Sequence, residues 1–300
     1  MSKLLKAQLA MLVVTLIFGM HYTIAKGLMP VFLQPMQLLF LRLFGGVILF
    51  WIFQRFTVKE KIEKKDLLIF AVCGLFGFTL NQAFFYEGLN MTTAVDASII
   101  HVMNPVFVLI FASILIREKV TWIKVTGIAL GAGGALILIL YGKSVNMSTN
   151  SFAGNILVML NMLFYAIYLV LLKPMTAKYH PMTVLKWVSL FGFLFILPFS
   201  FHGVMNMDLG LLDFKAWASV AFIILLNTFV AYLLINYALK TVTASSVSFF
   251  TYLQPVIASV MSVSLGKEMI TWPKVIAALL IFTGVYIINR KQEPLPTSDV

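Results

Sequence analysis

Residues 85–141 read FYEGLNMTTAVDASIIHVMNPVFVLIFASILIREKVTWIKVTGIALGAGGALILILY, and much of this stretch recurs 150 residues later. The matched positions include apolar, polar, charged and aromatic residues: Leu89 and Leu239, Ala94 and Ala244, Ser98 and Ser248, Asn104-Pro105 and Gln254-Pro255, Glu118 and Glu268, Thr121-Trp122 and Thr271-Trp272, Lys124-Val125 and Lys274-Val275, and Gly134 and Gly284. Apolar identities alone are common by chance, but one offset that also carries Pro, Glu, Trp and Lys indicates an internal repeat. We therefore predict two related halves.

The repeat extends outward to the start of each half, at a slightly shorter offset near 147 residues. The looser matches there are Phe18 with Tyr165, His21 with Tyr168, Lys26 with Lys173, and Phe44-Gly45 with Phe191-Gly192. We place the first repeat at residues 1–145 and the second at residues 146–290. Residues 291–300 contain two prolines and no apolar periodicity, so we expect a disordered cytoplasmic tail.

The composition indicates a membrane protein. Hydrophobic residues make up 61% of the 300 residues and charged residues only 11%, whereas soluble proteins carry about 25% charged residues. The net charge of +11 alone would suggest a nucleic-acid partner. The Lys and Arg residues are spread between the apolar runs, however, and the sequence predicts no nucleic-acid binding.

The apolar runs give the predicted architecture. A helix that spans a membrane needs about 20 mainly apolar residues. The segments that qualify are 4–26, 35–54, 66–88, 93–116, 121–141, 152–173, 182–201, 215–238, 242–265 and 271–289. Since each half holds five segments, an odd number, the second half must cross the membrane upside down. The predicted fold is all-α and polytopic, with ten transmembrane helices as two inverted five-helix repeats, an arrangement of secondary transporters with a site near the midplane.

The charges between the segments predict the orientation. Most loop Lys and Arg residues lie on one side of the membrane when both termini are cytoplasmic, as the positive-inside rule requires. We expect an integral multi-pass protein of the bacterial inner (plasma) membrane, as a monomer or a weak homodimer, with cytoplasmic N- and C-termini.

Polar and aromatic side chains recur at helical spacing in six of the predicted helices. Because polar groups facing lipid are costly, these faces should turn inward toward a cavity. The residues predicted to line a substrate cavity are His21, Gln82, Tyr86, Ser98, His101, Asn161, Tyr165, Tyr168, Tyr232, Asn236, Ser248 and Thr251. The alternative is that these side chains only form hydrogen bonds that hold the helices together.

Four residues are candidates for proton coupling: His101, His21, Glu87 and Asp96. A histidine titrates near neutral pH and can bind or release a coupled proton. Each histidine could instead be hydrogen-bonded to a neighbour, and the two carboxylates could be solvated helix ends.

Pro105 and Pro255 occupy matching places in the two halves, within predicted helices. Proline kinks a helix by freeing a carbonyl one turn back, so this pair could be gating kinks or static ones. Arg42 lies well inside a predicted helix and could brace a helix end, extend to the membrane interface or attract a carboxylate.

Several motifs resemble those of a known family. In the first half these are Asp96-Ala97-Ser98, Asn104-Pro105-Val106-Phe107, Arg117-Glu118-Lys119-Val120-Thr121, Gly127 and Gly134. In the second half they are Ala244-Ser245-Ser246, Gln254-Pro255-Val256, Gly266-Lys267-Glu268 and Gly284. Together they resemble the EamA domain of the drug/metabolite transporter superfamily. The resemblance implies a ten-helix carrier, often an exporter of amino acids or other small metabolites, although the family's Trp-Gly of the first helix is Phe18-Gly19 here.

The predicted function is secondary active export of a small metabolite, such as an amino acid or a related solute, by alternating access to a midplane cavity between the repeats. Uptake or exchange of the same kind of solute remains open. An intramembrane enzyme or a structural membrane protein is an alternative of another class. The chain holds no P-loop, HExxH or GxSxG motif, so we predict no enzyme, cofactor or metal. The expected partners are the small-molecule substrate, the lipid bilayer and a coupled proton.

Overall fold

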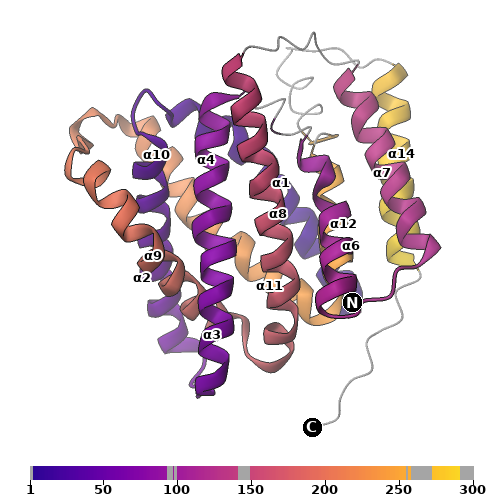
Figure 1. Cartoon of the computed structure of the whole chain (residues 1–300), viewed down its shortest axis with the longest axis horizontal. Coiled ribbons are helices and arrows are strands. Elements are labelled where there is room, and N and C mark those ends of the chain that lie inside the picture. The colour runs from indigo at the N-terminus through magenta and orange to yellow at the C-terminus, as the bar shows by residue number, and fades with distance from the viewer. Residues whose placement is uncertain are drawn as a thin grey trace.

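The computed structural model describes residues 3–92, 97, 100–140, 149–254, 256–257 and 272–290. Within these ranges every regular element is helical and no strand occurs. Figure 1 shows the long helices standing side by side in one bundle. The helices long and apolar enough to cross a membrane are Lys3–Leu28, Pro35–Thr57, Lys64–Met91, Phe152–Lys178, Pro181–Met205 and Phe214–Thr241. Two shorter apolar helices, His101–Leu115 and Val275–Ile287, accompany them.

The first half follows most of the predicted segments. Its elements are α1 (Lys3–Leu28), α2 (Pro35–Thr57), α3 (Lys64–Cys73), η1 (Gly74–Leu80), α4 (Asn81–Met91), η2 (His101–Met103), α6 (Asn104–Leu115) and α7 (Trp122–Leu140). α3, η1 and α4 together form one spanning rod, Lys64–Met91, where segment 66–88 was expected.

The second half has a similar order of elements, with η3 added between its second and third helices. Its elements are α8 (Thr149–Lys178), α9 (Pro181–Met205), η3 (Leu209–Leu211), α10 (Phe214–Phe222), η4 (Ile223–Val230), α11 (Ala231–Thr241), α12 (Ala244–Phe249), η5 (Phe250–Tyr252) and α14 (Trp272–Arg290). Much of segment 242–265 and the tail at 291–300 lie outside the described residues, as do Asp96, Ser98 and Pro255.

Local sequence explains where several helices begin. Pro35 occupies the first turn of α2, where its missing N–H needs no partner. The side chain of Asp213 accepts a hydrogen bond from Ala216 N at 2.7 Å at the start of α10. Thr243 accepts one from Ser246 N at 3.3 Å at the start of α12. These side chains satisfy N–H groups that have no partner inside the helix.

The outside of the bundle is apolar and its interior is partly polar. Trp122 is 83% exposed and Phe214 is 87% exposed. Arg42, in contrast, is only 2% exposed, and Asn236 is fully buried. An apolar outer surface of this kind suits contact with lipid, where unpaired polar groups are costly. Together with the spanning helices, it makes the chain an integral multi-pass membrane protein.

Each half contains a π-helix at the same repeat position. η1 and η4 are both π-helical and interrupt long apolar rods. The Thr79 hydroxyl donates to Gly74 O at 3.3 Å, and the Thr228 hydroxyl donates to Ile223 O at 2.8 Å. Such π segments are frequent near functional sites because they change which side chains face a neighbour.

The halves pack against each other with matched pairs of elements. α2 contacts α9, and α7 contacts α14. The contact of α4 with α8 has its counterpart in that of α1 with α11. α7 and α14 lie beside each other at one edge of the bundle in Figure 1. Glycines allow this approach, because a Cβ on Gly134 would lie 2.7 Å from Ala277 O and one on Gly284 would lie 2.8 Å from Gly127 O.

In each half, a lysine side chain caps the C-terminal end of a spanning helix. Lys26 Nζ donates to Leu89 O at 2.7 Å and to Thr92 O at 3.0 Å, at the end of α4. Lys173 Nζ donates to Leu239 O and, at 2.8 Å, to Val242 O, at the end of α11. Lysine suits this place because the last carbonyls of a helix lack partners and carry partial negative charge.

Candidate functional site

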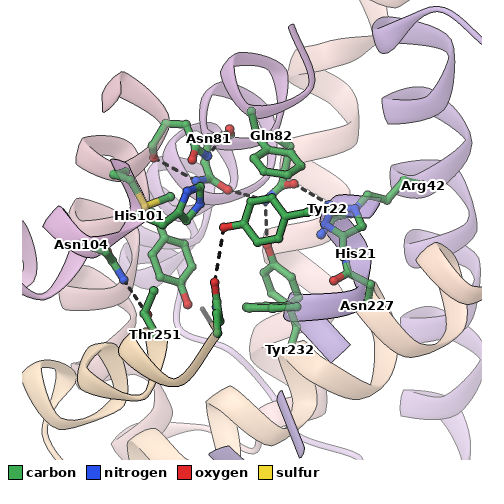
Figure 2. A pocket seen from close by; sticks show the side chains of 16 residues that line it. His21, Tyr22, Arg42, Asn81, Gln82, His101, Asn104, Asn227, Tyr232 and Thr251 are labelled. Atoms are coloured by element: carbon green, nitrogen blue, oxygen red, sulfur yellow. Dashed lines mark hydrogen bonds between the residues drawn. The ribbon is translucent and has the colours of Figure 1, made fainter. Parts of the chain in front are cut away.

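The interior of the bundle contains a cavity of about 70 Å³. Its walls come from α1, α2, α4, η2, α6, α8, η4, α11, η5 and the residues just after η5. The cavity therefore lies between elements of both halves. Figure 2 shows side chains from these elements converging on one space.

The structure brings together many of the predicted cavity residues. Those in the wall are His21, Gln82, His101, Asn161, Tyr165, Tyr232 and Thr251. Tyr86 lies directly behind the wall, fully buried, and contacts both Arg42 and His21.

Of the other predicted residues, Tyr168, Asn236 and Ser248 are described by the structure and are absent from the wall. Tyr168 is buried against Phe78 and Tyr232, with ring centroids 6.1 and 6.3 Å away. Asn236 donates to Tyr232 O at 2.9 Å, and Ser248 donates to Ser245 O at 2.7 Å. For Asn236 and Ser248 these bonds fit a structural role within the helices. Glu87 is partly buried and is absent from the described wall.

Nine wall residues were not among the predicted cavity residues: Phe18, Tyr22, Arg42, Asn81, Phe85, Asn104, Met162, Asn227 and Gln254. Two of them carry a signal in the sequence, because Asn104 and Gln254 are repeat mates that each precede a proline. Arg42 carries another signal, because it is an arginine well inside a predicted helix, and Phe18 is the repeat mate of Tyr165. The remaining ones have no comparable signal.

Arg42 is the buried charge of this site. Its Nε donates to Thr228 Oγ1 at 2.9 Å, and its Nη1 donates to Gln82 Oε1 at 2.5 Å and to Tyr86 Oη at 3.2 Å. The guanidinium carbon lies 5.8 Å from the ring centroids of Tyr86 and Tyr232. Arg42 thus neither braces a helix end nor extends to the membrane interface, because α2, α4 and η4–α11 enclose it.

The two histidines belong to one aromatic cluster. His21 Nε2 lies 3.0 Å from the Tyr86 hydroxyl, and its ring stacks on Phe85 with centroids 5.2 Å apart. His101 Nδ1 lies 2.8 Å from Ala97 O, and its ring meets Tyr22 edge-on at 5.2 Å. A carbonyl oxygen can only accept, so His101 Nδ1 must carry the hydrogen of that bond.

A reciprocal pair of amides joins the halves beside the cavity. Asn81 Nδ2 donates to Asn161 O at 3.0 Å, and Asn161 Nδ2 donates to Asn81 O at 2.6 Å. Both acceptors are backbone carbonyls, which fixes the nitrogen of each amide on this side. The side-chain oxygen of Asn161 must then point elsewhere, and no donor among the described residues reaches it.

The place of Pro105 differs from the prediction. The sequence suggested a kink within one continuous helix over 93–116. The structure instead has a 3₁₀ turn at η2, followed by α6 with Pro105 in its first turn. Proline suits this position because it lacks only an N–H that would have no partner there. The repeat-equivalent stretch has a 3₁₀ turn at η5, whereas Pro255 is outside the described residues.

Charged side chains join the halves at one end of the bundle. Lys178 Nζ lies 2.6 Å from Asp66 Oδ2, and it also pairs with Glu63. The Tyr179 hydroxyl donates to Asp66 Oδ2 at 2.6 Å. Hydrogen bonds from Lys178 and Lys65 hold the pKa of the exposed Glu63 carboxyl below its usual value. These contacts connect the α2–α3 loop and the start of α3 with the α8–α9 connection.

The chain matches one protein-family model, several curated proteins and a solved structure. The model of the EamA-like transporter family matches residues 5–140 and 152–290. An uncharacterized transporter of Archaeoglobus fulgidus is 29% identical over 280 residues, covering 92% of this chain and 95% of that protein. A "Probable terminal-alkyne amino-acid exporter" of Streptantibioticus cattleyicolor is 25% identical over 230 residues, covering 76% of this chain and 74% of that protein. A solved structure described as "Crystal structure of protein" has a TM-score of 0.75 at 16% identity, covering 96% of this chain and 98% of that one.

Proposed function

Because the chain belongs to the EamA-like transporter family, we propose that it is a secondary active transporter that exports a small metabolite, an amino acid or a related solute. The family establishes a transporter, which confirms the resemblance found in the sequence. The direction of transport, the class of solute and a bacterial inner membrane with both termini cytoplasmic are the proposal.

The observation that carries the proposal is the polar cavity between the two halves. Its wall holds a buried cation, Arg42, together with amides, phenols and imidazoles. Membrane proteins place such costly groups inside the bilayer where a solute passes. Within the described residues, no group of three His, Cys, Asp or Glu side chains could hold a metal ion.

The matched pairs of elements support alternating access. In the proposal, residues 1–145 and 146–290 form two inverted repeats that rock about the cavity. The contact of α4 with α8 and that of α1 with α11 are repeat equivalents, so a movement that loosens one and tightens the other would open the cavity on alternate sides. The ion pairs of Lys178 close the end that the charge bias assigns to the cytoplasm, and they would separate when that end opens.

The proposal is tested with the purified protein in liposomes. Vesicles loaded with a mixture of the twenty L-amino acids should accumulate external radiolabelled amino acid by counterflow, and an excess of the same unlabelled compound outside should abolish this accumulation. The matched control is Gly133→Ala, because a Cβ at Gly133 would meet nothing within 4 Å, so this variant should transport normally. Counterflow equal to that of protein-free liposomes for every amino acid would contradict the proposed solute class.

Proton coupling through the cavity histidines is part of the proposal. The repeat mates of His21 and His101 are Tyr168 and Thr251, so a titratable imidazole stands on one side of each pair only. This asymmetry would let one conformation hold a proton more tightly than the other, as coupling requires. Since His101 Nδ1 carries its hydrogen toward Ala97 O, Nε2 is the atom that would take up the coupled proton.

We expect His101→Gln to flatten the pH dependence of the initial transport rate between about pH 5 and 8, the range in which histidine titrates. His21 is the alternative coupling residue, so His21→Gln is measured in the same way. The pH profile of the double variant should be no flatter than that of the more affected single variant. The measurement is initial uptake into proteoliposomes with and without an imposed proton gradient. Unchanged pH profiles and gradient responses in all three variants would remove histidine from the mechanism.

A further inference from the structure

Arg42 has a buried positive charge without an anionic partner. Its hydrogen bonds go to the neutral groups of Thr228, Gln82 and Tyr86, and in the described part of the chain no carboxylate pairs with it. A guanidinium has five N–H donors, and the hydroxyl of Tyr232 is a further neutral partner. A buried charge is costly unless it is paired. The guanidinium of Arg42 is therefore suited to bind an anion from outside the described chain.

The same cavity contains buried acceptors without donors. The side-chain oxygens of Asn104 and Asn161 are buried, and no described group donates to them. Asn104 is 1% exposed and Asn161 is 2% exposed. The amide nitrogens are already engaged, that of Asn104 with Thr251 Oγ1 at 3.2 Å and that of Asn161 with Asn81 O at 2.6 Å. The free oxygens are therefore acceptors that a positively charged donor can fill.

Arg42 and Asn104 lie on opposite sides of the cavity, whereas a third wall oxygen without a donor among the described residues, that of Asn227, lies on the Arg42 side. Figure 2 shows Arg42 at one side of the pocket and Asn104, beside Thr251, at the other. Arg42 comes from α2, whereas Asn104 and Asn161 come from α6 and α8. A solute that satisfies both sides has an anionic end and an ammonium end joined by a short frame.

Resting on the proposed function, we propose that Arg42 binds the carboxylate of the transported solute and that the side-chain oxygens of Asn104 and Asn161 accept hydrogen bonds from its ammonium group. The solute is then a small zwitterion, and each of its two charges is recognised by a different wall. A planar guanidinium matches a carboxylate with two parallel hydrogen bonds. Neutral amide oxygens bind an ammonium group without adding a second buried charge.

The test compares the amino acid that gives the strongest counterflow with its methyl ester, which lacks the carboxylate, and its N-acetyl derivative, which lacks the ammonium. Binding is measured by thermal stabilisation of the purified full-length protein, and transport by competition in counterflow. In the unsubstituted protein we expect each derivative to bind at least tenfold more weakly than the amino acid.

Arg42→Gln should lower affinity for the amino acid at least tenfold and bring the amino acid and its methyl ester close to equal affinity. Arg42→Lys keeps the charge and should retain part of the preference for the amino acid, which provides a test if the glutamine variant does not fold. Asn104→Leu should remove discrimination against the N-acetyl derivative without changing discrimination against the ester. Gly133→Ala should leave both ratios unchanged.

The outcomes separate the two proposals. Equal binding of the amino acid and its ester by the unsubstituted protein would overturn the zwitterion while the carrier stands. An unchanged ratio of amino acid to ester affinity in Arg42→Gln would overturn the role of Arg42. If that variant does not fold, an unchanged ratio in Arg42→Lys would overturn it. Simple amines or simple carboxylates could instead show counterflow while no amino acid shows counterflow or stabilises the protein. The chain would then still be a carrier, but the proposal of a zwitterionic solute would be wrong. Absence of counterflow and of stabilisation by all of these compounds would overturn both.

Discussion

Replacing Tyr232 with alanine is expected to lower the free energy of unfolding by about 3–5 kcal/mol, the range for truncation of a buried aromatic ring. The Tyr232 side chain is 1% exposed. Its ring centroid lies 4.7 Å from that of Phe78 and 6.5 Å from that of Phe18. The ring also packs on the guanidinium of Arg42, so the alanine variant loses packing and leaves this charge less well enclosed.

Tyr232→Phe is the matched control. It keeps the ring and removes only the hydroxyl that accepts a hydrogen bond from Gln82 Nε2 at 2.9 Å, which should cost about 1 kcal/mol. The measurement is the unfolding transition of the purified protein in detergent, followed by tryptophan fluorescence. Equal transitions for the alanine and phenylalanine variants would show that the ring contributes nothing beyond its hydroxyl.

Replacing Gly74 with alanine should disrupt the contact between η1 and α9. A Cβ at Gly74 would lie 2.8 Å from both Gly192 N and Val188 O. Both are backbone atoms, so the methyl group fits only if the two helices separate. The Thr79 hydroxyl, which donates to Gly192 O at 2.9 Å, would move with them. We expect the free energy of unfolding to fall by at least the roughly 1–3 kcal/mol that is typical of an overpacked core.

The repeat supplies a matched variant for this prediction. Gly45 is the repeat mate of Gly192, and a Cβ on it would lie 2.7 Å from Cγ2 of Ile224, which stands at the position equivalent to Gly74. An isoleucine side chain can change its rotamer, so Gly45→Ala should be milder. The comparison is made by melting temperature and by size-exclusion chromatography. A Gly45→Ala variant as damaged as Gly74→Ala would contradict the argument from backbone contact.

The sequence predicts the membrane-spanning rods well because their signal is local. Twenty apolar residues between Pro, Gly and charged residues define a span with no knowledge of its neighbours, and α2 begins at Pro35 as expected. The EamA-like family follows from motifs that lie along one stretch of chain. The ten-helix count and the inverted arrangement depend in part on residues outside the described ranges and stay predictions.

The cavity is less predictable because it depends on how distant helices meet. The i, i+4 spacing of Phe78 and Gln82 would put both on one face of a continuous α-helix. The residues from Gly74 to Leu80 are π-helical instead, and Phe78 packs on Tyr168 and Tyr232 while Gln82 faces the cavity. The position of Arg42 could not be predicted either, because its partner Thr228 lies 186 residues away in the other half.

The paired π-helices also bear on how the lineage can change. A π-turn holds one residue more than the α-turn it replaces, so a one-residue deletion within 74–80 or 223–230 would restore α-helical geometry. The wider turn accommodates the extra residue, so the helix after it would keep its face, whereas side chains inside the turn would rotate by up to about 100°, the angle between successive residues of an α-helix. Asn227, which lies in η4 and in the wall, would then leave the wall. Relatives that differ in length at these two places are therefore expected to have diverged in the solute they carry, even where their cavity residues align.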